Sequence, residues 1–307
     1  MFADNYGLWS RPLVFVIGKG GVGKTTVAVA LARACAARGA TALVCAFAPA
    51  HALLSDVESI VVEPEPALRE WLSRHLGRHA AALVLRSPAF SYFVAAAPGA
   101  AELVMVGKAI DLARAGKHDC VIVDAPATGH ALAMLGAPRT FASLAPLGPV
   151  AHEAAELGRR LADPAQTAYV GVTAPEELAV AELFDLERDL PEVVGRGLDL
   201  VVVNGVHPDR FSDEVAQRLQ TAGLDAVLAE HRLARRQAER VAEVRRGAQA
   251  PVVTLAFEFP PADPSRSHTR AAAGAAGVDA GAGRRPTRSG ARRGSPATAP
   301  VRPPTPR

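Results

Sequence analysis

The sequence has 307 residues, of which 49% are hydrophobic and 21% charged, enough to bury a sizeable core in one large or two smaller domains. Its net charge of +3 is misleading, because residues 260–307 carry nine arginines and two aspartates and the rest of the chain therefore has a net charge of −4. It has no run of 18 uncharged apolar residues and no basic N-terminal stretch followed by an apolar one, so we expect no membrane-spanning helix and a cytoplasmic location.

The first elements in chain order predict a strand, a helix and a second strand. A short β-branched run at residues 13–17 is typical of a buried strand. Residues 25–38 repeat apolar side chains at helical spacing and stop before Gly39, and residues 42–47 indicate another buried strand. Such a unit is typical of parallel sheets that are covered by helices on both faces.

The middle of the chain is mostly helical in pattern, with helices expected at residues 67–76 and 101–115 and a strand at 90–97. Residues 57–118 form a block too long for a simple crossover. Together with the mixed loop and helix of residues 139–165, this block is expected to form a helical subdomain over the ligand-binding edge of the sheet.

The second half continues the alternation of strands and helices. We expect strands at residues 118–124, 169–173, 198–203 and 251–257. A helix is expected from Pro175 to about residue 190, and residues 212–247 are charged and helical in pattern. We therefore predict an α/β fold with a doubly wound, mainly parallel sheet over residues 11–259. Residues 260–307 contain nine prolines and no Leu, Ile, Phe, Met, Trp or Tyr, so a disordered tail rich in Pro and Arg is expected.

A glycine-rich turn lies between the first strand and the first helix and reads GKGGVGKTT. It matches the phosphate-binding pattern G-x-x-x-x-G-K-[ST] completely, in the strand–turn–helix context that the pattern requires, so we expect the sheet to be that of a P-loop NTPase. Backbone N–H groups of such a turn surround phosphate oxygens, Lys24 is expected to contact the β- and γ-phosphates, and Thr25 is expected to bind Mg²⁺. The predicted phosphate-binding residues are Gly18, Lys19, Gly20, Gly21, Val22, Gly23, Lys24, Thr25 and Thr26.

Three further residues follow other strands of the predicted sheet. Asp124 ends the strand HDCVIVD, where an aspartate can hold the Mg²⁺ shell together with Thr25. Gly129 lies in the turn that follows and can bring a main-chain N–H close to the γ-phosphate. Asn204 ends an apolar strand and can bond an adenine edge, although a turn-forming Asn-Gly pair is the alternative.

The order of GKGGVGKTT, PAHALLSD, DAPATGHALAML and VVVNGV resembles the ArsA family, the arsenite-pump and tail-anchored-protein-targeting ATPases, over roughly residues 11–259. The resemblance implies a deviant Walker A motif in which Lys19 reaches across a dimer to the partner's nucleotide. It also implies switch I at residues 48–56, switch II at 124–130, adenine contact by Asn204, and ATP with Mg²⁺ as cofactors. Lys19, Lys24 and Asp124 become the expected catalytic residues of dimers that close around two nucleotides and open after hydrolysis.

The sequence departs from the family pattern in three places. Ala48 replaces the switch I aspartate that activates the attacking water, the paired cysteines of some members are absent, and the final helix is replaced by the tail. The cysteines, Cys35, Cys45 and Cys120, are widely spaced in apolar segments and are expected to be buried core residues. Arsenite transport thus gains no support from them.

Two functions therefore stay open. One is a dimeric Mg-ATPase that handles a hydrophobic or membrane-protein client. The other is a hydrolytically weak ATP-binding subunit that pairs with an active paralogue. Nucleic acid is not an expected partner. The candidate residues for a client groove, each of which can also be ordinary core, are Trp71, Phe90, Tyr92, Phe93 and Met105.

Overall fold

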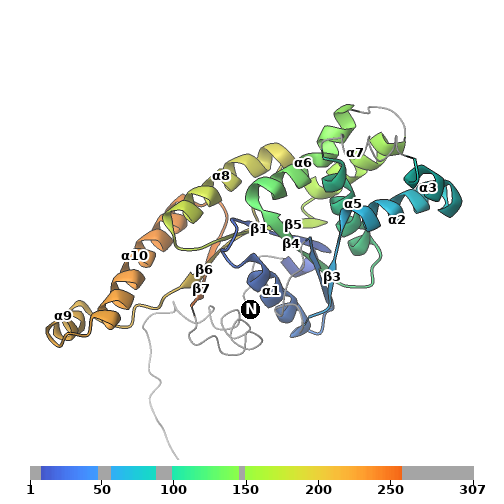
Figure 1. Cartoon of the computed structure of the whole chain (residues 1–307). Coiled ribbons are helices and arrows are strands. Elements are labelled where there is room, and N and C mark those ends of the chain that lie inside the picture. Colours follow the sequence, from blue (N-terminus) through green and yellow to red (C-terminus); the bar gives the residue numbers. More distant parts are fainter. Residues whose placement is uncertain (1–7, 48–56, 88–98, 145–148, 258–307) are drawn as a thin grey trace, which may run out of the picture. The chain divides into compact units, whose positions relative to one another are not determined.

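The computed structural model describes residues 8–47, 57–87, 99–144 and 149–257. The strands in these residues form one sheet in the order β3-β2-β4-β1-β5-β6-β7, and all neighbouring strands are parallel (Figure 1). This sheet confirms the predicted α/β fold. The strands are β1 (Leu13–Gly18), β2 (Ala42–Ala46), β3 (Ser59–Val61), β4 (Cys120–Ala127), β5 (Thr167–Thr173), β6 (Leu200–Val206) and β7 (Val252–Ala256).

β1 lies at the centre of the sheet between β4 and β5, and all six of its residues are buried. Val14 and Val16 pack on one face, in the cluster that contains the apolar side of α1 (Lys24–Ala36). Phe15 and its neighbours on the other face pack in a second cluster with several helices. A strand that is covered on both faces needs a continuous apolar run, which is why the sequence LVFVI identified it.

The second face of the sheet carries most of the helices. Residues of α5, α6, α7 and α8 pack against β1, β2, β4 and β5, and α8 and α10 pack against β6. Figure 1 shows α5, α6 and α8 on the opposite side of the sheet from α1. The bounds are α2 (Pro64–Leu76), α3 (Arg78–Leu85), α5 (Ala100–Arg114), α6 (Thr128–Leu144), α7 (Pro149–Ala162), α8 (Glu177–Val194), α9 (Asp213–Thr221) and α10 (Asp225–Gly247), with a short 3₁₀ helix at Leu8–Ser10.

Two features differ from the expected elements. β3 was not predicted, because it has only three residues, none of them buried, at the edge of the sheet beside β2. The helical stretch 212–247 is divided into α9 and α10 at Gly223, whose φ of 71° is left-handed and stops a helix. The predicted strand at 90–97 and the predicted tail at 260–307 lie outside the described residues. The limits of the helical subdomain, residues 57–118 and 139–165, stay a prediction.

The cysteines are core residues, as expected. Cys35, Cys45 and Cys120 are free thiols with at most 1% exposure. Burial raises the pKa of Cys45 and of Cys120 to about 12, so both thiols stay protonated at neutral pH. None of the described helices combines the length and the apolar character needed to cross a bilayer.

Candidate functional site

The glycine-rich turn leaves the carboxyl end of β1 and enters α1 at Lys24. Gly21 and Gly23 have φ angles of 88° and 90°, which favour glycine. Two glycines are also required by close packing: a Cβ on Gly18 would lie 2.1 Å from the carbonyl oxygen of Val172 in β5, and one on Gly23 would lie 2.2 Å from Nδ2 of Asn204. The shape of the turn therefore depends on neighbouring strands as well as on its own sequence.

Thr25 and Asp124 meet beside this turn. The Thr25 hydroxyl donates a 2.6 Å hydrogen bond to Oδ2 of Asp124, which lies in β4 next to Val16 of β1. The other carboxylate oxygen, Oδ1, is buried and has no hydrogen-bond partner. Burial raises the pKa of Asp124, an effect that Thr25 and Lys24 oppose. A buried oxygen without a partner needs a ligand, and a cation satisfies it, so this pair fits the predicted Mg²⁺ site.

Lys24 is the second incompletely satisfied group. Its Nζ donates a 3.1 Å hydrogen bond to the backbone carbonyl of Lys19. Burial lowers the pKa of Lys24, whereas the charges of Asp124 and Glu182 act to raise it. A half-buried ammonium at the start of α1 is suited to phosphate oxygens, since an anion would offset the cost of partly burying its charge.

Lys19, the expected trans lysine, is engaged within its own chain. Its Nζ forms an ion pair with Oε1 of Glu182 in α8. Glu182 was missed in the sequence because no motif surrounds it. The signal that could have found it is structural: α8 starts at the carboxyl end of β5, and β5 is the neighbour of β1.

Asn204 lies in β6 and contacts the phosphate loop. Its Nδ2 donates a 2.9 Å hydrogen bond to the backbone carbonyl of Val22, and it fills the space that a side chain on Gly23 would need. The β6–β7 register shifts between Val203 and Val206, around Gly205 with its φ of 74°. Asn204 thus holds the loop, and the adenine contact of its amide stays a prediction.

The predicted switch II residues run from the end of β4 into α6, and the last three of them, residues 128–130, begin the helix. Gly129 is the second residue of the helix, and a Cβ built on it would meet nothing within 4 Å, so its expected approach to a γ-phosphate stays a prediction. The neighbouring hydroxyl of Thr128 is buried without a partner, a feature that the sequence pattern did not reveal. Switch I, including Ala48, lies outside the described residues.

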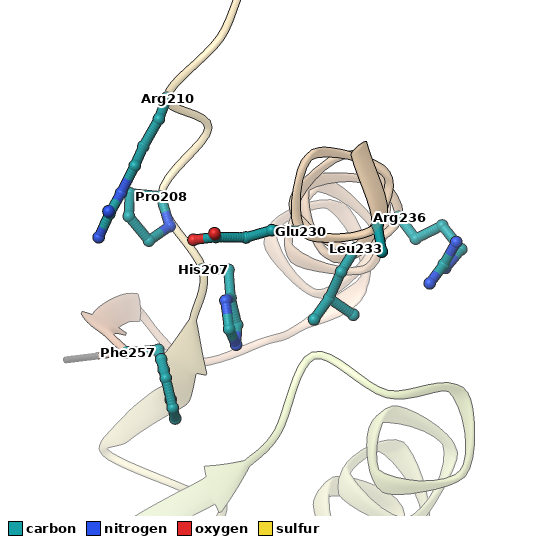
Figure 2. A pocket seen from close by; sticks show the side chains of 8 residues that line it. His207, Pro208, Arg210, Glu230, Leu233, Arg236 and Phe257 are labelled. Atoms are coloured by element: carbon teal, nitrogen blue, oxygen red, sulfur yellow. The ribbon is translucent and has the colours of Figure 1, made fainter. Parts of the chain in front are cut away.

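A cavity of about 490 Å³ opens at the carboxyl ends of β6 and β7. His207, which follows β6, stacks on Phe257, which follows β7, with ring centroids 4.3 Å apart and an angle of 11° between the planes. Figure 2 shows Glu230 reaching from α10 toward the segment that carries Pro208. The lining residues are His207, Pro208, Arg210, Ala229, Glu230, Leu233, Arg236 and Phe257.

The client-groove candidates are only partly described. Met105 in α5 packs against the second core cluster, which favours ordinary core for this side chain. Trp71 lies in α2 with intermediate exposure. Phe90, Tyr92 and Phe93 lie outside the described residues, so the predicted groove stays a prediction.

Comparisons with known proteins match part of the chain to the family that the motifs resemble. The profile of the anion-transporting ATPase (ArsA ATPase) family matches residues 11–73. A Halobacterium salinarum protein that carries the provisional name arsenical pump-driving ATPase is 26% identical over an alignment of 234 residues that covers 65% of this chain and 36% of that protein. The Mycobacterium tuberculosis protein named ATPase BagA is 27% identical over an alignment of 209 residues that covers 59% of this chain and 61% of that protein. The matches thus span about a third and about three-fifths of these relatives.

Proposed function

We propose that this chain, whose family match and relatives support membership of the ArsA-type ATPases, binds ATP with Mg²⁺ at the phosphate loop and hydrolyses it. One observation carries the proposal. The Thr25–Asp124 pair leaves a buried carboxylate oxygen without a partner next to the half-buried ammonium of Lys24. These groups complement a cation and a phosphate chain at the same place.

Each residue has a defined part in this proposal. The loop from Gly18 to Thr26 supplies backbone N–H groups, Lys24 neutralises phosphate charge, and Thr25 and Asp124 hold the metal. When bound, Mg²⁺-ATP supplies the γ-phosphoryl group that is transferred to water. Asn204 keeps the loop in place through the carbonyl of Val22.

The proposal also includes a dimer, a client protein and a cellular location. By the family resemblance, two copies close around two nucleotides, and Lys19 acts on the partner's nucleotide. The client is proposed to be a hydrophobic or membrane protein that meets the helical segments in the cytoplasm. The Halobacterium relative is named for driving an arsenical pump, but no arsenite role is proposed for this chain, because its cysteines are buried in the core.

A second candidate function follows from Ala48, the residue at the position of the family's switch I aspartate. An alanine methyl group cannot accept a proton or orient water, so hydrolysis by this chain alone would be slow. In that case the chain is an ATP-binding subunit that pairs with a paralogue in which the aspartate is present.

Calorimetric titration of the purified chain with ATP and Mg²⁺ tests the binding site. Lys24→Ala should weaken ATP binding by about 100-fold, because it removes a charged partner from a desolvated phosphate site. Lys117→Ala, which removes an exposed lysine after α5, is the matched control and should bind ATP like the unaltered chain. Equal affinity of Lys24→Ala and the unaltered chain would show that the phosphate-loop assignment is wrong.

Phosphate release by the unaltered chain and by Ala48→Asp separates the two functions. Sustained Mg²⁺-dependent turnover by the unaltered chain would exclude the weak-subunit candidate. Tight ATP binding without turnover in the unaltered chain, together with partial turnover in Ala48→Asp, would support the weak-subunit candidate. The same protein samples, analysed by light scattering with and without ATP, report whether nucleotide drives two copies together.

A further inference from the structure

Glu182 is a carboxylate beside a phosphate-binding loop, where negative charge is unexpected. Its Oε1 pairs with Nζ of Lys19, and the two side chains are 34% and 29% exposed. Its charge also acts to raise the pKa of Lys24, so it lies within electrostatic reach of both lysines of the loop. The other side of the loop already has Asp124.

A nucleotide and Glu182 would compete for the same ammonium group. The phosphates carry negative charge into a half-buried site, where a like charge on Glu182 is repelled more strongly than in bulk water. Lys19 can relieve this repulsion by leaving Glu182 and pairing with a phosphate. Because about a third of each side chain is exposed, solvent screens the pair and opening it costs little free energy.

We propose that Glu182 is a positioning residue that holds Lys19 within its own chain before nucleotide binds and gives it up to a nucleotide phosphate afterwards. This proposal rests on the proposed ATP binding, and it holds whether the phosphate belongs to the same chain or to a partner. Glu182 acts through Lys19 and contacts no reacting atom. Its effect is to make release of Lys19 depend on nucleotide.

The test compares Glu182→Gln with Asp185→Asn in the full chain. Both variants remove one carboxylate from α8, but Asp185 is an exposed residue paired with Arg188, at 2.8 Å, and not with the loop. The accessibility of the Lys19 amine is measured by mass spectrometry after brief acetylation, with and without ATP and Mg²⁺. ATP affinity is measured by calorimetry, and folding of each variant by thermal unfolding.

Without nucleotide, Lys19 should be acetylated faster in Glu182→Gln than in the unaltered chain or in Asp185→Asn. Glu182→Gln should also bind ATP about two- to fivefold more tightly, the range expected for loss of a partly exposed ion pair. Adding Glu182→Gln to Lys19→Ala should give a clearly smaller gain, limited to the direct repulsion between Glu182 and the phosphates, because the rest of the effect passes through Lys19. A merely structural role of Glu182 would not depend on Lys19 in this way.

Unchanged acetylation of Lys19 in Glu182→Gln would overturn the inference, as would a gain in ATP affinity that is equally large in the Lys19→Ala background. A different result would contradict the proposed function. If the unaltered chain does not bind ATP, both proposals are wrong, whereas normal ATP binding with identical behaviour of Glu182→Gln and Asp185→Asn refutes the role of Glu182 alone. Glu182→Ala repeats the comparison if the glutamine variant unfolds.

Discussion

Asp124 and Glu187 are two carboxylates whose pKa is raised by burial, yet their surroundings differ. Glu187 lies in α8 and is 5% exposed, and its Oε1 accepts hydrogen bonds from the N–H groups of Gln249 and Ala250, at 3.1 and 3.2 Å. Asp124 lies at the phosphate loop and accepts one bond from Thr25, while its second oxygen is buried without a partner.

The difference separates a carboxylate that the chain satisfies from one that it leaves for a ligand. Glu187 fastens α8 to the turn before β7, so its burial serves the packing of the fold. At the phosphate loop the chain keeps a buried oxygen of Asp124 and the half-buried ammonium of Lys24, and their charges are only partly compensated. Burial and a shifted pKa are shared by both regions, and the missing partner is what marks the ligand site.

The largest expected effect is at the backbone of the phosphate loop. Gly18→Ala places a methyl group 2.1 Å from the carbonyl oxygen of Val172 and must separate β1 from β5, so it should lower the free energy of unfolding by about 2–3 kcal/mol. Gly20→Ala is the control, since a Cβ there meets nothing within 4 Å, and it should change stability by less than about 0.5 kcal/mol. Urea denaturation compares them, and equal midpoints would contradict the close packing.

A smaller effect is expected when each of the two carboxylates is replaced by an amide. Asp124→Asn keeps an oxygen for the Thr25 hydroxyl but removes the charge offered to a metal, so Mg²⁺ should strengthen ATP binding about tenfold less than in the unaltered chain. Glu187→Gln removes the same charge from the structural site and should leave the Mg²⁺ effect unchanged. Calorimetry with and without Mg²⁺ measures both. An equal loss of the Mg²⁺ effect in both variants would contradict the distinction between a ligand site at Asp124 and a structural site at Glu187.

The smallest expected effect is the pH dependence from Glu187. Its folded pKa is raised above its ordinary value of 4.5, so the folded chain binds this proton more tightly than the unfolded chain does. The resulting stabilisation is fully present below 4.5 and is lost as the pH rises through the folded pKa. Stability of Glu187→Gln should therefore fall less between about pH 4 and pH 7 than that of the unaltered chain. Parallel urea midpoints across this range would show that Glu187 does not contribute.

The sequence by itself determined the features that depend on neighbouring residues. A continuous apolar run made β1 a strand buried on both faces, and the glycine-rich turn after it required no distant information. Asp124 could be placed beside Thr25 because strand-terminal residues of a parallel sheet meet at one edge, and the structure has them in contact. The short edge strand β3 was missed because three residues carry too little pattern.

Only the tertiary structure decided which distant side chains complete the site. Glu182 is 163 residues from Lys19, and Asn204 is 182 residues from Val22, so neither pairing follows from local spacing. Both depend on the order of strands, which places β5 beside β1 and brings β6 and α8 within reach of the loop. The local motif therefore defines the phosphate loop, while packing of the sheet selects the residues that hold its lysine and its backbone.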